Sequence, residues 1–270
     1  MPHIDPGAQR HIDIGEQHHI ELGAQRLEYE FIDVGGVPSA PTLVFLHEGL
    51  GSVALWKDFP RKMAAASGCN ALVYSRYGYG SSTPLNGSRE PTFMHDEALL
   101  VLPRLLDAFD IRDPILFGHS DGASIALIHA GSAARSVRGM VLMAPHVMIE
   151  DICITSIAAV KRSYETTDLR EKLRRYHADP DGAFWGWCNI WLDPRFRWWN
   201  IEEHVQKITC PILAIQGFED EYGTMEQIER ISRLTPDTEL LKLKSCGHSP
   251  HRDQPEAVIA AASRYIERLR

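Results

Sequence analysis

The fold is decided by the stretch Ile115-Leu116-Phe117-Gly118-His119-Ser120-Asp121-Gly122-Ala123-Ser124-Ile125-Ala126. An apolar run that predicts a buried strand meets a Gly-x-Ser-x-Gly pentapeptide, and a helical pattern of small and apolar residues follows it, from 122 to 134. A serine at so sharp a turn has a strained backbone, and the two glycines permit strand and helix to approach closely. We therefore predict that the Ser120 hydroxyl is an exposed nucleophile; the alternative is a tight turn with an incidental serine.

Strand and helix patterns alternate on both sides of this stretch. Apolar runs that predict buried strands cover residues 42–46, 71–75, 114–117, 137–144, 211–216 and 239–243. Helical patterns cover residues 57–67, 94–109, 122–134, 225–234 and 255–269. Residues 19–22 and 26–32 alternate like a hairpin that turns at Gly23-Ala24. Such alternation predicts an α/β fold, a mostly parallel sheet with right-handed crossovers and helices on both faces.

The composition changes between residues 146 and 208. This segment shows no strand pattern, is helical and charged, and holds five of the six tryptophans of the chain. We predict an inserted helical cap at 146–208 on a core formed by 1–145 and 209–270. The tryptophans form either the core of this small unit or a wall that faces a ligand.

The chain supplies partners for a nucleophilic serine in the expected order. Asp220 and His248 each follow a predicted strand, and functional residues of open α/β sheets collect at the carboxyl ends of strands. The order Ser120, Asp220, His248 resembles that of the α/β-hydrolase arrangement. Glu219 and Glu221 flank Asp220 and are the alternatives for the acid; the spacing from Gly217 favours Asp220.

Two backbone amides are candidates for an oxyanion hole. The N–H of Asp121 begins the helix after the serine, where the helix dipole favours negative charge. The glycine-bearing turn 47–52 follows an early strand, and we predict that the Gly49 N–H is the second donor.

These residues resemble the α/β-hydrolase fold superfamily, over about residues 20 to 270. The strings His47-Glu48-Gly49-Leu50-Gly51-Ser52, Gly118-His119-Ser120-Asp121-Gly122 and Cys246-Gly247-His248-Ser249-Pro250-His251 are similar to a bacterial group of small capped serine hydrolases of unassigned substrate. The resemblance implies Ser120 as nucleophile, His248 as base, Asp220 as acid, and Gly49 and Asp121 as oxyanion positions. The sequence departs from the pattern at Glu48, where many relatives have glycine. Dienelactone hydrolases resemble it in having a glutamate in this turn, although their nucleophile is cysteine.

Further residues are candidates for substrate binding. Glu48 either contacts substrate or forms a salt bridge within its loop, and His146 either faces the pocket or is a surface or hinge histidine. The tryptophans considered for the wall are Trp185, Trp187 and Trp191. We expect the remaining histidines near these motifs to support their turns (His47, His119) or to have a structural or hydrogen-bonding role (His251).

Composition limits the partners. The chain has 270 residues, a net charge of −8 and a pI near 5.9, without a basic run, so nucleic acid and anionic membranes are not expected partners. No apolar stretch is long enough to span a bilayer, and the N-terminus lacks a signal-peptide pattern, so we expect a cytoplasmic protein.

The five cysteines are scattered and predict free thiols. The polar, His-rich residues 1–18 lack metal-ligand spacing and predict a leader, and neither a metal nor an organic cofactor is implied.

The motifs indicate an enzyme that hydrolyses a carboxylic ester, lactone or thioester of a small, partly apolar or aromatic molecule. The same scaffold supports C–C bond hydrolysis and perhydrolysis, which remain alternatives. A ligand-binding receptor with a residual triad is the alternative from another class; intact motifs disfavour it. The oligomeric state is open, and a homo-oligomer is compatible with the sequence.

Overall fold

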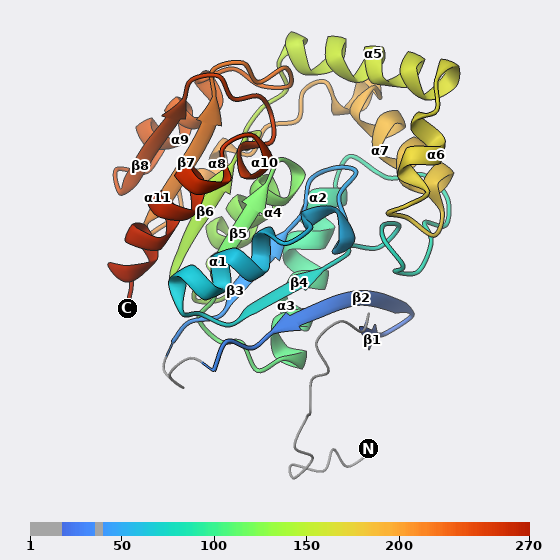
Figure 1. The fold of residues 1–270 in the computed structure, drawn as a ribbon. Helices are drawn as coiled ribbons and strands as arrows, with labels where there is room; N and C mark the ends of the chain where they lie inside the picture. Colours follow the sequence, from blue (N-terminus) through green and yellow to red (C-terminus); the bar gives the residue numbers. More distant parts are fainter. Residues whose placement is uncertain (1–17, 36–39) are drawn as a thin grey trace.

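A computed structural model describes residues 18–35 and 40–270 and shows one eight-stranded sheet with helices on both faces (Figure 1). The predicted leader lies almost entirely outside the described residues. The strand order is β1-β2-β4-β3-β5-β6-β7-β8. The strands are β1 (His18–Leu22), β2 (Gln25–Ile32), β3 (Leu43–Leu46), β4 (Ala71–Tyr74), β5 (Ile115–His119), β6 (Gly139–Met143), β7 (Ile212–Gly217) and β8 (Thr238–Leu243).

The sheet is parallel from β4 to β8 and antiparallel at one edge. β1 and β2 form the predicted hairpin, which turns at Gly23-Ala24, and β2 pairs antiparallel with β4. Every other neighbouring pair runs parallel. The predicted α/β fold with a mostly parallel sheet is therefore confirmed, and the carboxyl ends of β3, β5, β6, β7 and β8 meet at one edge.

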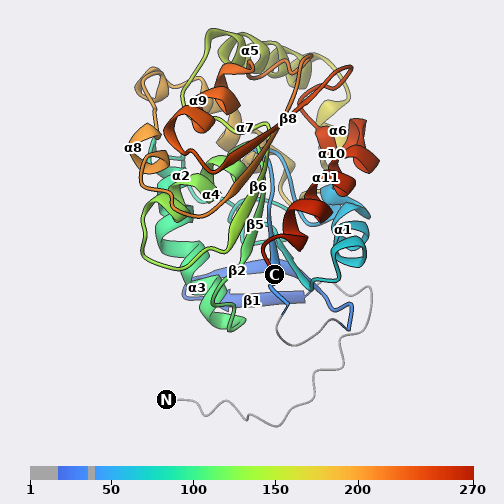
Figure 2. The ribbon, with the colours of Figure 1, turned by 90° about the vertical axis from the view of Figure 1, so that its left-hand side faces the viewer.

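Side chains alternate between two apolar layers because successive residues of a strand point to opposite faces. In β3, Val44 and Leu46 join the cluster under α3 and α4, while Leu43 and Phe45 join the cluster under α1 and α11. Figure 2 shows α1 and α11 on one side of the sheet and α3, α4 and α9 on the other. These helices are α1 (Phe59–Ser67), α3 (Leu102–Ala108), α4 (Asp121–Gly131), α9 (Glu226–Leu234) and α11 (Pro255–Glu267).

The helix predicted over 94–109 is interrupted in the middle. It consists of α2 (Phe93–Asp96), a π-helical turn (Glu97–Val101) and α3. Pro103 lies in the first turn of α3. A proline lacks the N–H for an internal helical bond, and its ring crowds the carbonyl four residues earlier, so a wider turn before it relieves the clash.

Helices fill the chain between β6 and β7. They are α5 (Asp151–Thr166), α6 (Leu169–Leu173), α7 (Pro180–Trp191), the short η3 (Pro194–Phe196) and α8 (Glu202–Val205). Figure 1 shows α5, α6 and α7 grouped beyond one edge of the sheet, whereas α8 packs against α4 and α9. Within the described part of the chain, the segment between β6 and β7 forms one isolated β-bridge, between Met148 and Asn200. None of the described helices combines the length and apolar character that a bilayer crossing requires.

Candidate active site

The turn between β5 and α4 holds Ser120 in a strained conformation. Its φ of 52° and ψ of −120° lie where side-chain-bearing residues are rare. A Cβ at Gly122 would collide with the carbonyl of Leu46, and a Cβ at Gly118 would collide with the backbone of Ala123. Both glycines are therefore needed for the close approach that lifts the serine to the end of the strand.

Three side chains from three loops meet in a hydrogen-bonded chain. The Ser120 Oγ lies 2.9 Å from the His248 Nε2. The His248 Nδ1 lies 2.8 and 2.9 Å from the two carboxylate oxygens of Asp220. Asp220 also accepts the N–H groups of Tyr222 and Gly223, at 2.8 and 3.2 Å, which fixes its carboxylate. The predicted residues are thus together, and it is Asp220 that contacts the histidine rather than the exposed Glu219.

The carboxylate shifts the titration of the histidine. Burial lowers the pKa of His248, but the charge of Asp220 and its hydrogen bond outweigh this, so the pKa is raised. Burial raises the pKa of Asp220, and the opposing effect of His248 prevails and lowers it. A raised histidine pKa and a lowered aspartate pKa describe a pair that stabilises an imidazolium next to a carboxylate.

Two backbone amides near Ser120 are free. Asp121 is the first residue of α4, so its N–H has no partner within the helix. Gly49 follows β3. Among the described residues, neither N–H donates to a protein acceptor. The two amides predicted from the sequence are therefore available for an oxygen of a bound molecule.

His119, next to the serine, links two other loops. Its Nε2 lies 2.7 Å from the His248 carbonyl oxygen, and its Nδ1 lies 2.8 Å from the Glu48 Oε2. Burial raises the pKa of Glu48, but the charge and hydrogen bond of His119 overcome this and hold it well below its usual range. Because a carbonyl and a carboxylate only accept, both nitrogens of His119 carry protons in this arrangement. The Glu48 carboxylate therefore pairs with His119, at the turn that carries Ser120, and not within its own loop; it also lines the cavity, which keeps the alternative of a substrate contact.

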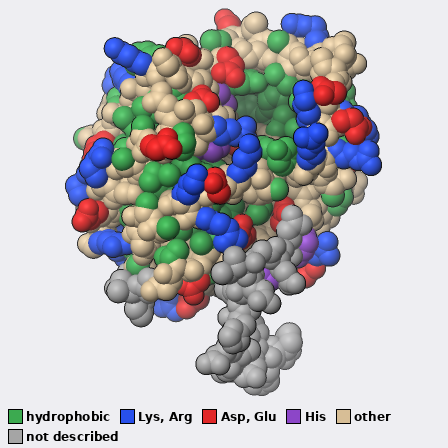
Figure 3. All heavy atoms as spheres, viewed as in Figure 1, with side chains coloured by type: hydrophobic (Ala, Val, Ile, Leu, Met, Phe, Trp, Pro, Cys, Tyr) green, Lys and Arg blue, Asp and Glu red, His purple; other side chains and the backbone are tan. Residues whose placement is uncertain are grey.

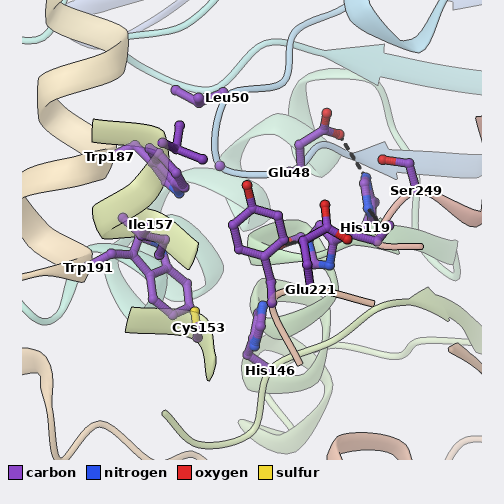
Figure 4. Close-up of a pocket in the computed structure, with 15 residues that line it drawn as sticks. Glu48, Leu50, His119, His146, Cys153, Ile157, Trp187, Trp191, Glu221 and Ser249 are labelled. Carbon is purple, nitrogen blue, oxygen red and sulfur yellow. Dashed lines mark hydrogen bonds and ion pairs between the residues drawn. The ribbon is translucent and has the colours of Figure 1, made fainter. Parts of the chain in front are cut away.

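A cavity of about 220 Å³ opens over these residues. On the face seen in Figure 3 the surface is hollowed, with hydrophobic side chains inside and a histidine at the edge. Trp187, Trp191 and Ile157 lie on one side and Glu48 and His119 on the other (Figure 4). The lining residues are Glu48, Gly49, Leu50, His119, Ser120, His146, Cys153, Ile157, Val160, Trp187, Trp191, Glu221, Tyr222, His248 and Ser249.

His146 is a buried pocket residue and not a surface histidine. Burial, reinforced by the nearby His248, lowers the pKa of His146 to about 3. Its ring centroid lies 5.8 Å from that of His248 and 5.1 Å from that of Trp191. His146 is therefore a neutral imidazole beside the serine and histidine at ordinary pH, and it is available for hydrogen bonds but not as a cation.

Some of the tryptophans form a wall of the cavity and others pack in the core of the helical segment, so each of the two predicted roles is found. Trp187 and Trp191 line the cavity. A side chain at Gly49 would collide with the Trp187 indole, so the tryptophan lies directly on the turn that carries a free amide. Trp185 does not line this cavity; it packs edge-on against Tyr164 and Phe184, and we withdraw it from the substrate-binding set.

A second part of the wall comes from residues that were not predicted from the sequence. Cys153, Ile157 and Val160 line the cavity from α5. They are spaced i, i+4, i+7, which places them on one helix face, so helical periodicity was the available signal. Tyr222 was also missed, although it lies two residues after Asp220.

His251 has no part in this chain of contacts. It is buried against Trp56 and Phe59, and among the described residues neither ring nitrogen has a hydrogen-bond partner. Of the two roles expected for it, structural or hydrogen-bonding, His251 therefore has the structural one, which is packing. The described part of the chain contains no group of three or more His, Cys, Asp or Glu side chains arranged to hold a metal ion.

Comparisons with known proteins identify the family and the fold. The model of the alpha/beta hydrolase family matches residues 43–262. Esterase YbfF of Escherichia coli is 24% identical over 195 residues, which cover 66% of this chain and 77% of that protein. Among solved structures, one from a study of carboxylesterases of Nitrososphaera gargenis matches with a TM-score of 0.76 at 17% identity. The match covers 93% of this chain and 98% of the other. The enol-lactonase of Burkholderia xenovorans matches with a TM-score of 0.73 at 16% identity, and the match covers 93% of this chain and 100% of the enol-lactonase. At such identities the structural matches show the fold.

Proposed function

The chain belongs to the alpha/beta hydrolase family and is a hydrolase, and from this we propose that it cleaves an ester-type bond with a Ser120-His248-Asp220 triad. One observation carries the proposal: the continuous contact from the Ser120 Oγ through the His248 ring to the Asp220 carboxylate. A serine hydroxyl is a poor nucleophile until a base removes its proton, and this contact supplies the base and orients it.

The mechanism follows from the positions of the donors. His248 takes the proton of Ser120 while the oxygen attacks the carbonyl carbon, and Asp220 stabilises the imidazolium that forms. The N–H groups of Gly49 and Asp121 bind the oxyanion of the tetrahedral intermediate. His248 then gives its proton to the leaving oxygen or sulfur, and an acyl-enzyme remains. A water molecule activated by His248 releases the acid by the same steps.

The cavity supports a small substrate with an apolar or aromatic acyl group. Its volume of about 220 Å³ is below the range of roughly 300–1,000 Å³ typical of sites for drug-sized ligands. Trp187, Trp191 and Ile157 offer a flat and apolar wall, and carboxylates at Glu48 and Glu221 lie opposite. Since no Lys or Arg of residues 18–35 and 40–270 lines the cavity, a neutral acyl group fits better than an anionic one.

We propose that residues 146–208 act as a cap on a core of 1–145 and 209–270. The part that covers the site is α5 to α7, because α8 packs on the core helices α4 and α9. His177, just after α6, supports this division: its Nε2 donates to the Leu50 carbonyl at 3.0 Å, and its Nδ1 accepts the Gly80 N–H at 3.0 Å. These bonds attach the cap beside the turn that carries Gly49.

The test is the initial rate on nitrophenyl esters from acetate to decanoate, with a benzoate, for the wild type and Ser120→Ala. We expect turnover that peaks at one acyl type and falls by roughly 10⁵-fold or more in the variant, since only the nucleophile is lost. Ser132→Ala, at the far end of α4, is the matched control and should keep the wild-type rate.

An unchanged rate in a folded Ser120→Ala protein would refute the triad. A fluorophosphonate label should attach to Ser120 in the wild type and not in the variant. Labelling without ester turnover would direct the next assays to C–C bonds in vinylogous diketones and to perhydrolysis.

A further inference from the structure

Three donors converge on the carbonyl oxygen of Glu48. The Arg76 Nη2 donates at 2.9 Å, the Gly51 N–H at 3.0 Å and the His47 Nδ1 at 2.6 Å. The His47 Nε2 accepts the backbone N–H of Arg76 at 3.0 Å, so the single proton of a neutral ring lies on Nδ1. Burial lowers the pKa of His47 far enough to keep it neutral. All three contacts are therefore donations to one acceptor.

This convergence fixes the direction of the Gly49 N–H. The carbonyl of Glu48 and the N–H of Gly49 belong to one planar, trans peptide, in which they point in opposite directions. With the carbonyl held by three donors, the N–H is directed away from them, and it donates to no acceptor among the residues described. Donors on the oxygen also polarise the peptide, which makes the N–H a stronger hydrogen-bond donor.

Arg76 also reaches the residue that carries the second free amide. Its Nη2 lies 3.5 Å from the Asp121 Oδ2, and both side chains are almost fully buried. Burial lowers the pKa of Arg76, but Tyr79, Asp121 and Glu97 together overcome this and raise it. The guanidinium is thus a permanent buried charge between the turn after β3 and the start of α4.

We propose that Arg76 is a positioning residue that builds the oxyanion hole, by orienting the Gly49 amide through the Glu48 carbonyl and anchoring α4 through the Asp121 carboxylate. The proposal rests on the proposed serine hydrolase function. Arginine suits the role because the two N–H bonds of the planar Nη2 point at fixed angles, toward the Glu48 carbonyl and the Asp121 carboxylate, whereas the lysine ammonium is a point charge on a flexible stem. Its charge lies behind the site where negative charge develops in the transition state.

The competing explanation is that Arg76 only neutralises the buried carboxylates Asp121 and Glu97. In that case the loss of Arg76 would reduce the stability of the fold. The enzyme would still bind a transition-state analogue more tightly than a ground-state analogue, by the same factor as the wild type. Arg89 is the matched control: it contacts the same Tyr79 ring, at 4.8 Å, and donates to the Tyr77 carbonyl at 2.9 Å. It has no hydrogen bond to Glu48, Gly49 or Asp121 in the described structure.

The experiment compares Arg76→Met, Arg76→Lys and Arg89→Met with the wild type, using the best ester of the panel. It measures kcat, KM, the thermal midpoint, and the inhibition constants of a boronic acid and of a substrate-like amide. The boronic acid accepts the Ser120 oxygen, and one oxygen of its tetrahedral adduct occupies the oxyanion position; the amide stays planar. Both inhibitors carry the acyl side chain of that ester.

For Arg76→Met we expect kcat to fall about 100-fold, with a similar rise in the boronic acid constant, the effect typical of losing an oxyanion donor. KM and the amide constant should change less than threefold. Arg76→Lys should lower kcat about tenfold and raise the boronic acid constant by a similar factor, because the charge stays while the fixed geometry of the guanidinium is lost. Arg89→Met should lower the thermal midpoint and leave the ratio of the two inhibition constants unchanged.

If Arg76→Met does not fold, Arg76→Lys decides, because it keeps the charge and most of the apolar stem. A folded Arg76 variant with wild-type kcat and boronic acid inhibition overturns the proposal, as does a loss confined to KM. Failure of the proposed function gives a different result, namely turnover that survives Ser120→Ala.

Discussion

The loops at the carboxyl ends of the strands and the helices that cover them are held in different ways. The loops after β3, β5 and β8 are joined by a polar network in which His119 connects Glu48 to the backbone of His248. The wall from α5 and α7 contacts the cavity mainly through apolar and aromatic side chains. Hydrogen bonds fix direction, whereas apolar contacts depend chiefly on buried area. For the proposed esterase activity, we therefore expect the loops to determine which bond is attacked and the wall to determine which acyl group fits.

The largest effect should come from Asp220→Asn, which changes the partner of His248 in the polar network. We expect turnover to fall by roughly 10⁴-fold, because the amide neither holds the productive tautomer nor stabilises the imidazolium. His248 acts as a base only when neutral, so kcat/KM rises as the pH passes upward through its pKa. Since Asp220 raises that pKa, the acid limb should lie above about 6.5 in the wild type and move to lower pH in the variant.

The measurement is the pH profile of kcat/KM for both proteins. Glu219→Gln is the control from the same loop and should keep the wild-type profile. If Glu219→Gln or Glu221→Gln lost turnover instead, the acid would have been misassigned.

The next largest effect should come from disturbing the contact between the Gly49 turn and the Trp187 indole, in Gly49→Ala. The added Cβ would meet the Trp187 indole, although the backbone at Gly49 is open to alanine because its φ is not positive. We expect kcat/KM to fall about 10- to 100-fold, as overpacking displaces the free amide or the tryptophan. Gly49→Ala with Trp187→Ala should recover most of the loss. Effects of the two changes that simply add in a double-mutant cycle would show that the contact does not matter.

A smaller effect should follow loss of the hydrogen-bonding group of Glu48. Glu48→Ala leaves the Nδ1 of His119 without its partner, and we expect kcat to fall about tenfold, as for a lost hydrogen bond to a charged group. Glu48→Gln should retain most activity, because its amide can donate to the Nδ1 of a neutral His119 while Nε2 still donates to His248. Steady-state kinetics of the two variants at neutral pH test this. Equal losses would mean that the negative charge itself is required.

The smallest effect should be on substrate preference. Trp187→Ala enlarges the cavity, so we expect the ratio of rates on decanoate and acetate esters to rise by about tenfold. Trp185→Ala removes a tryptophan about half a helical turn away that does not line the cavity, and its ratio should stay within about twofold of the wild type. A larger change for Trp185 than for Trp187 would reverse the assignment of the wall.

The fold and the chain of Ser120, His248 and Asp220 could be predicted because both depend on local signals. Each residue directly follows a strand pattern, and parallel strands bring their carboxyl ends to one edge whatever the remaining contacts are. The glycines at 118 and 122 carried similar information, because only a glycine permits the approach that the structure shows there.

The partners within the site depended on the tertiary structure. Glu48 contacts His119 across 71 positions, and Arg76 contacts Asp121 across 45. Nothing in a helical or strand period specifies which buried charge meets which acceptor. The tryptophans show the same limit: Trp185 and Trp187 lie on one helix two residues apart, and only the packing of α7 decides which of them faces the cavity.

The sequence by itself therefore determined the order of strands and helices, the sharp turn at Ser120 and the loops that carry Asp220 and His248, because these follow from backbone sterics and hydrophobic period. Only the tertiary structure decided how Glu48 and Arg76 are used and which aromatic side chains face the cavity. The physical reason is that polar side chains gain their roles from partners far away in the chain, and those partners become neighbours only when the sheet has formed.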